Sequence, residues 1–103
     1  MTASTSLEAG RDAIARAPIV RDVVLRLLAS RNEPVTHQEI IGDYRRLMIL
    51  EPDTPNASDS GIRTRVSELV AVGLVEAADE EGRSSAGKRS IRWVITKAGR
   101  ARL

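Results

Sequence analysis

Short hydroxyl and guanidinium side chains gather in one stretch of the sequence, residues 58–72. Apolar residues recur there at helical spacing, at Ile62, Val66, Leu69 and Val70, so one face of a helix is expected to be buried. The rest of its surface is left to polar residues: Ser60, Arg63, Thr64, Arg65 and Ser67. Side chains of these types reach phosphates and base edges in a DNA groove. The stretch therefore indicates a helix that contacts nucleic acid.

The two arginines of this helix have two interpretations. Either Arg63 or Arg65 could bind O6 and N7 of a guanine in a bidentate manner, a contact that is worth about 1–3 kcal/mol of discrimination. Alternatively, both arginines could form ion pairs with Glu68 or Asp59 at the edge of the same helix. Glu68 is also spaced to orient Arg65 at i, i+3.

An extended ribbon is expected to follow the helix. Gly73 ends the helix, residues 74–78 and 90–96 are predicted as strands, and residues 79–89 as the hairpin loop between them. The second strand alternates, with Ile91, Trp93 and Ile95 on one face, and Trp93 is expected to anchor the ribbon on the core. The ribbon carries the basic residues Arg83, Lys88, Arg89 and Arg92, which would bind phosphate or reach into the minor groove. Three acidic residues at its base, Asp79, Glu80 and Glu81, oppose such contact.

Charge is unevenly distributed along the chain, although the net charge is only +2. Residues 82–103 hold seven basic residues and no acidic one, whereas residues 51–81 hold eight acidic residues and two basic ones. The basic block favours a polyanionic partner at the C-terminal end. A solvated basic tail is the alternative.

Two helices are expected upstream. Pro18 suits the first turn of a helix that ends near Asn32, and apolar residues at Ile19, Val20, Val23, Val24, Leu27 and Leu28 give it a broad buried stripe. Thr36 and Glu39 have the spacing of a capping box that opens the next helix. Residues 51–57, with two prolines, are predicted as a loop, and Ser58 or Asp59 as the cap of the third helix.

The order of helix, helix, helix, strand, hairpin and strand resembles winged helix-turn-helix DNA-binding domains. Residues 62–70 and 73–75 are similar to the recognition helix and first wing strand of small actinobacterial and phage winged-helix proteins. Residues 96–100 resemble the segment that closes the wing in MarR-like regulators. The resemblance covers residues 18–103 and implies an α+β fold, with a three-helix core, a two-stranded wing and a recognition helix at about 58–72 in the major groove. Residues 1–17 are expected to form an N-terminal arm or a short helix.

Several other functions find little support in the sequence. Residues 82–88 match the G-x-x-x-x-G-K pattern of a P-loop, but Arg89 stands where Ser or Thr should bind Mg²⁺. His37 is the sole histidine, the chain has no cysteine, and no apolar run is long enough to span a bilayer. We therefore expect no enzyme activity, no cofactor, no metal site and no membrane partner.

The sequence thus predicts a cytoplasmic, double-stranded DNA-binding protein, a small transcriptional regulator or phage-type accessory factor. The basic wing, residues 82–92, would lie on the DNA backbone. A homodimer through the N-terminal segment or the first helix fits the same sequence. The alternative is a winged-helix module that binds proteins and not DNA, and it would require an exposed aliphatic patch on the first helix or the N-terminal arm.

Overall fold

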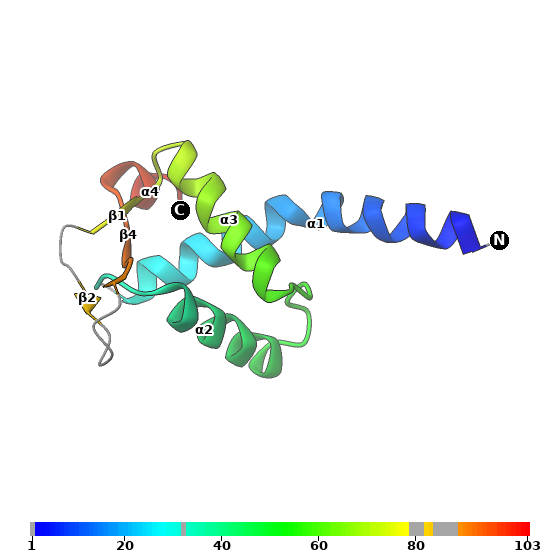
Figure 1. Ribbon diagram of the computed structural model, residues 1–103, viewed down its shortest axis with the longest axis horizontal. Helices are drawn as coiled ribbons and strands as arrows, with labels where there is room; N and C mark the ends of the chain where they lie inside the picture. Colours follow the sequence, from blue (N-terminus) through cyan, green and yellow to red (C-terminus); the bar gives the residue numbers. More distant parts are fainter. Residues whose placement is uncertain (1, 32, 79–81, 84–88) are drawn as a thin grey trace.

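The computed structural model describes residues 2–31, 33–78, 82–83 and 89–103, with side chains described for 16–31, 33–78 and 91–103. Its elements are α1 (Thr2–Arg31), α2 (His37–Leu50), α3 (Asp59–Ala71), β1 (Val75–Ala77), β2 (Gly82–Arg83), β3 (Arg89–Ser90), β4 (Trp93–Ile95) and α4 (Lys97–Arg102). Figure 1 shows α1, α2 and α3 packed together, with the strands at one end of this helical body.

Helix α1 is longer than the sequence predicts. It begins at Thr2 and contains Pro18 in its interior, so the prediction that a helix starts at Pro18 is wrong. A proline inside a helix removes one hydrogen bond. Here the residues before it are rich in alanine, a strong helix former, and the helix continues through it. The end of α1 at Arg31 agrees with the predicted end near Asn32. Its N-terminal half extends well beyond the body (Figure 1).

Helix α2 starts with the predicted capping box. The Oγ1 atom of Thr36 accepts a hydrogen bond from the backbone N–H of Glu39, and the Glu39 carboxylate accepts one from the N–H of Thr36. Arg31 at the end of α1 donates two hydrogen bonds to Asp43 of α2, at 2.8 and 2.9 Å. This bidentate pair fixes the end of α1 against α2.

Helix α3 also begins and ends as the sequence predicts. The Oγ atom of Ser58 accepts a hydrogen bond from the N–H of Gly61. Gly73 follows the helix with a φ of 80°, a left-handed conformation that glycine adopts without strain. That turn lets the N–H of Leu74 bond back to the carbonyl of Leu69, and it directs the chain into β1.

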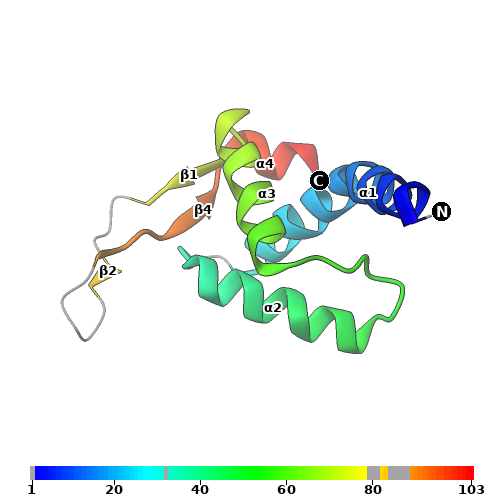
Figure 2. The same cartoon turned by 45° about the vertical axis from the view of Figure 1, so that its right-hand side comes forward.

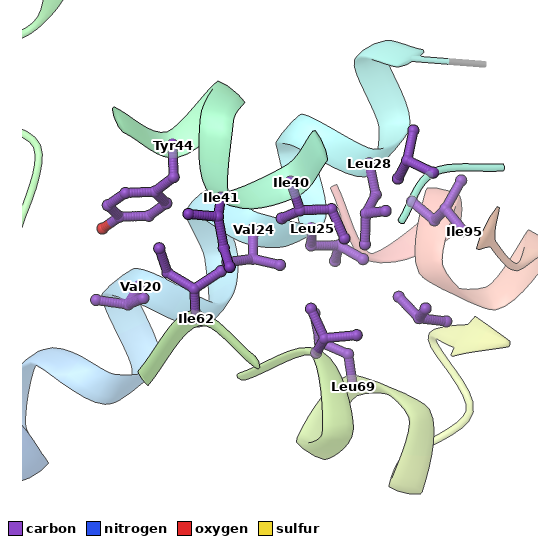
Figure 3. Packing of buried hydrophobic residues seen from close by; sticks show 13 residues of the cluster. Val20, Val24, Leu25, Leu28, Ile40, Ile41, Tyr44, Ile62, Leu69 and Ile95 are labelled. Carbon is purple, nitrogen blue, oxygen red and sulfur yellow. The ribbon is translucent and has the colours of Figure 1, made fainter. Parts of the chain in front are cut away.

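The core lies between these helices and the strand pair (Figure 3). It is aliphatic except for Tyr44, as the absence of phenylalanine requires. Its buried members are Val20, Val24, Leu25, Leu28, Val35, Ile40, Ile41, Tyr44, Ile62, Val66, Leu69, Val75 and Ile95. The Tyr44 hydroxyl donates a hydrogen bond to the carbonyl of Pro55 at 2.7 Å, so the core also holds the loop that precedes α3.

Strands β1 and β4 pair in antiparallel fashion, with Val75 opposite Ile95 and Ala77 opposite Trp93. Trp93 also bridges to Val35, which precedes α2, through backbone hydrogen bonds of 2.9 and 2.7 Å. Strand β4 therefore lies between two backbone partners. Figure 2 shows β1 and β4 leading away from the helices toward β2.

Two details of the predicted ribbon need correction. Part of the predicted loop is a second strand pair, because β2 pairs with β3 and Arg83 lies opposite Arg89. Ile91 is 59% exposed and not on the buried face, because β4 begins only at Trp93. The expectations for Asp79, Glu80, Glu81 and Lys88 lie outside the described residues.

Helix α4 follows β4 as a short capped helix. Thr96 caps it through a hydrogen bond from the N–H of Gly99. Gly99 is buried against the carbonyl of Leu74, so α4 packs closely on the turn between α3 and β1. Within the described residues, no helix has the length and hydropathy needed to cross a bilayer.

Candidate nucleic-acid interface

The outward face of α3 presents the polar residues that the sequence singled out. Because Ile62, Val66 and Leu69 face the core, Ser60, Arg63, Thr64 and Ser67 are left on the outer side of the helix. The hydroxyl of Thr64 donates to the carbonyl of Ser60 at 2.9 Å, and that of Ser67 donates to the carbonyl of Arg63 at 3.2 Å. Their oxygen lone pairs remain accessible, and a hydroxyl can rotate to donate elsewhere. We call Ser60, Arg63, Thr64 and Ser67 the α3 face.

Arg63 is the cation of the α3 face. Its side chain is exposed and makes no hydrogen bond or ion pair with another side chain in the described part of the chain. It lies close enough to His37, the first residue of α2, for its charge to lower the pKa of the imidazole. Arg63 therefore carries an uncompensated positive charge on the side of α3 that borders the start of α2.

Arg65 lies in a different environment. Its side chain is only 17% exposed, and its Nε atom lies 2.6 Å from Oε1 of Glu68. That close approach is an ion pair without hydrogen-bond geometry, since Arg65 Nε has no hydrogen-bond partner among the described residues. Arg65 also lines a hollow of about 240 Å³ with Arg16 and Ala17 of α1. The structure thus turns Arg65 toward α1 and does not bring it onto the α3 face.

The acidic residues beside the α3 face are both compensated. The carboxylate of Asp59 accepts a hydrogen bond of 2.5 Å from Arg45 of α2. Glu68 pairs with Arg65 and also accepts two hydrogen bonds from Arg21 of α1, at 3.0 and 3.3 Å. A carboxylate that is already paired repels a phosphate less than a bare one does. The ion pairs therefore leave the positive charge of Arg63 as the dominant charge on the α3 face.

The hairpin contributes further basic residues. The register of β2 and β3 brings Arg83 and Arg89 to the same position along the hairpin. The predicted phosphate-binding residue Lys88 lies outside the described residues. Arg92 is partly buried, and its Nε atom is buried with no hydrogen-bond partner among the described residues. Arg89 and Ser90, which directly follow the P-loop-like residues 82–88 of the sequence, form strand β3, whereas a P-loop leads into a helix.

Contacts between α2 and β4 connect the hairpin to the α3 face. The rings of His37 and Trp93 have their centroids 5.3 Å apart. Trp93 packs against the core, as expected of an anchor. In Figure 2 the start of α2, the middle of α3 and β4 border the same region of the molecule. Arg63, His37 and Trp93 thus form a series that crosses from α3 through α2 to the base of the hairpin.

Three supporting residues were not anticipated in their roles: Arg21, Arg45 and His37. Arg21 and Arg45 compensate the acids of α3 from other helices, and His37 joins α2 to β4. The sequence signal for Arg21 and Arg45 was their position off the apolar faces of α1 and α2, which indicated a polar role but no partner. In the residues whose side chains are described, no group of His, Cys, Asp and Glu is arranged to bind a metal ion.

No protein-family model matches the sequence, and no curated protein matches it. Among solved structures, the chain is similar to a PadR-like transcriptional regulator from Bacillus cereus, with a TM-score of 0.62 and 16% sequence identity. The similarity covers 84% of this chain and 76% of that one. At this low sequence identity, the similarity supports a shared fold and nothing more. Together with three helices followed by an antiparallel strand pair, it shows that the chain has the predicted α+β winged-helix fold.

Proposed function

We propose that the protein binds double-stranded DNA and acts as a transcriptional regulator in the cytoplasm. Helix α3 enters the major groove, where Arg63 binds a base edge and Ser60, Thr64 and Ser67 bind phosphates or bases. Arg83, Lys88, Arg89 and Arg92 of the wing bind the DNA backbone. The name of the similar Bacillus cereus protein, a transcriptional regulator, supports this proposal.

One observation carries the proposal. Arg63 projects from α3 without an ion pair in the described part of the chain, whereas Asp59 and Glu68 on the same helix are compensated by other arginines. Intramolecular pairing of Arg63 would have left the helix without a cation for a duplex. Arg65 is a weaker candidate for base contact, because Glu68 already engages it.

Selection from a random duplex library by gel shift, followed by fluorescence anisotropy on the selected duplex, tests the proposal. Arg63→Ala should weaken binding to the selected duplex about tenfold to a hundredfold, the range of one bidentate base contact. Arg46→Ala is the matched control, because Arg46 is exposed and lines a hollow between α1 and α2 that includes no residue of α3. Equal affinities of the two variants for the selected duplex would contradict the proposal that α3 is the DNA-binding helix.

We further propose a homodimer formed through α1. The N-terminal half of α1 extends beyond the body (Figure 1), and a lone helix of this length is marginal in water. Ile19, where α1 meets the body, is 52% exposed. Sedimentation equilibrium over a concentration series should show a monomer–dimer transition that Ile19→Glu weakens. A monomer at every concentration would contradict the proposal.

The rival proposal is a module that binds another protein. The adjacent side chains of Ile49 and Leu50 are exposed at the end of α2 and not on the first helix, where the patch was expected, but they are an aliphatic pair that favours it. Substitution of both by Glu leaves DNA affinity unchanged if DNA is the partner. A chain that selects no duplex at low salt would favour this rival.

A further inference from the structure

Three elements of the fold meet at the side chain of His37. This residue is the first of α2, and its ring lies against Trp93 of β4, with 5.3 Å between the ring centroids and 35° between the planes. From α3, the charge of Arg63 acts on the imidazole. His37 is thus placed to link the α3 face to the base of the wing.

The contact between the two rings is a packing contact without a directed hydrogen bond. Both His37 Nε2 and Trp93 Nε1 are buried, and neither has a hydrogen-bond partner among the described residues. Beside the rings, the backbone bridge between Val35 and Trp93 is the connection of β4 to the segment before α2. The position of the wing base, where β4 begins at Trp93, therefore depends on this bridge and on the contact of the His37 ring with Trp93.

A proton on His37 would disturb this arrangement for several reasons. An imidazolium carries N–H donors on both nitrogens, and the buried Nε2 has no acceptor among the described residues. The ring also sits at the N-terminus of α2, where the helix dipole disfavours a cation. Burial first, and the positive charge of Arg63 second, lower the pKa of His37 below its ordinary value.

The other charged residues near the first turn of α2 do little to stabilise a positive charge on His37. On α2, the Glu39 carboxylate accepts hydrogen bonds from Thr36 and lies 3.5 Å from Arg31 of α1, so it is already engaged. The residue before Trp93 is Arg92, a second cation. Among the described residues, Arg63 is the charged group that lowers the pKa of His37.

We propose that neutral His37 is a positioning residue that holds the wing beside the α3 face, and that a proton on its ring releases this contact. The consequence for DNA rests on the proposed function, since Arg63 and the wing must engage one duplex together. The ring contact itself does not depend on DNA. Acidification below the ordinary histidine range thus loosens the wing and lowers duplex affinity.

Substitutions of His37 separate the roles of the ring and the charge. His37→Phe keeps a flat ring against Trp93 but takes up no proton, whereas His37→Lys places a permanent cation at the same position. Gln38→Lys is the matched control, because Gln38 is exposed in the same first turn of α2. A cation there meets the same helix dipole but not Trp93.

Amide hydrogen exchange, measured by NMR on the full chain without DNA, reports the wing base directly. The bridge contributes two amides, those of Val35 and Trp93. The reference is the amide of Thr96, which bonds to Leu74 at the opposite end of the strand pair. In the wild type, acidification should lower the protection of the Val35 and Trp93 amides against exchange several-fold relative to that of the Thr96 amide. In His37→Phe, this relative protection should stay unchanged. His37→Lys should resemble the acidified wild type at neutral pH.

Fluorescence supplies a second readout, because Trp93 is the sole tryptophan and His37 the sole histidine. Trp93 emission should titrate in one step below the ordinary histidine range in the wild type and stay constant in His37→Phe. Identical titrations of the two proteins, or equal loss of bridge protection in His37→Lys and Gln38→Lys, would overturn the proposal.

Duplex affinity against pH then tests the consequence. Wild-type affinity should fall more steeply than that of His37→Phe as the pH decreases below about 6.5, because the folded chain lowers the pKa of His37 from this ordinary value. His37→Ala should bind about twofold to tenfold more weakly at neutral pH, the range of one aromatic contact. Tighter wild-type binding on acidification would make His37 a phosphate ligand and overturn the positioning role. If no variant binds any duplex, the proposed function fails, while hydrogen exchange still decides the role of His37.

Discussion

The Nε atom of Arg65 lies 2.6 Å from Oε1 of Glu68, one helical turn further along α3. Because Arg21 binds the same carboxylate oxygen from α1, Glu68 stands between two guanidinium groups. Arg63, only two residues before Arg65 in the sequence, makes no such pair in the described part of the chain. Arg63 and Arg65 both lie at polar positions of the predicted helix, yet only Arg65 is held by an ion pair among the described residues. Arg63 is therefore the better placed of the two to contact a partner.

This difference predicts contrasting base preferences. Arg63→Ala should relax the preference at one or two base pairs of the selected duplex, at a cost of about 1–3 kcal/mol of discrimination. Arg65→Ala should leave the preference unchanged, because its partner is Glu68 and not a base. Repeating the duplex selection with each variant measures both outcomes. A preference that changes with Arg65→Ala and not with Arg63→Ala would reverse the assignment.

The basic residues of the wing should make DNA affinity depend on salt concentration without adding a preference for particular bases. Arg83 and Arg89 occupy the same position along the β2–β3 hairpin, and binding to phosphate carries no base preference. Replacement of either by Ala should reduce the slope of log affinity against log salt by about 0.9 for each phosphate that is no longer neutralised. Anisotropy titrations at several salt concentrations check this, with Arg26→Ala, which removes an exposed arginine of α1, as the control. Slopes equal to that of the control would contradict the placement of the wing on the DNA backbone.

Helix caps and periodicity made much of the fold predictable. Thr36 with Glu39, Ser58 and Gly73 each act locally, within one helical turn, and each has the predicted role. The partners of Arg21 and Arg45 were not predictable, because Glu68 and Asp59 lie 47 and 14 residues away in the sequence. Ion pairs between residues so far apart in the sequence depend on how the helices pack. The spacing of residues within one helix does not predict that packing.

The predicted strands 74–78 and 90–96 were also only partly predictable from the sequence. Alternation placed Ile91 with Trp93 and Ile95, yet Ile91 is exposed because the strand is interrupted before Trp93. Trp93 itself was correctly expected to anchor the ribbon. Its contact with His37 joins β4 to α2, and no spacing within either segment indicates it. The roles of Arg63, Arg65 and the wing residues in DNA contact stay predictions.

A pair of glycines predicts opposite effects on stability. A Cβ atom at Gly99 would collide with the carbonyl oxygen of Leu74 and the side chain of Ile95. Gly99→Ala should therefore lower the free energy of unfolding by about 1–3 kcal/mol, the usual cost of overpacking. Gly42→Ala, in a position of α2 with open space around it, should raise it by roughly 0.5–1 kcal/mol. Urea denaturation checks both, and equal effects would contradict the packing of α4.

The His37 environment predicts how stability depends on pH. The folded state lowers the pKa of His37 from its ordinary 6.5, chiefly through burial, so the unfolded chain binds the proton more readily. The free energy of unfolding should therefore fall as the pH decreases from about 6.5 through the folded-state pKa. Urea denaturation across this range should show a steeper decline for the wild type than for His37→Phe. Stability that increases on acidification relative to His37→Phe would contradict the burial of the neutral ring.

The proposed function requires that the α3 face and the wing meet one duplex. An NMR titration of the full chain with the selected duplex tests this most directly. We expect the largest amide shift changes at Ser60, Arg63, Thr64 and Ser67 and in the described wing residues Arg83, Arg89 and Arg92. Shift changes confined to α1 and the end of α2, with the α3 face unaffected, would contradict it.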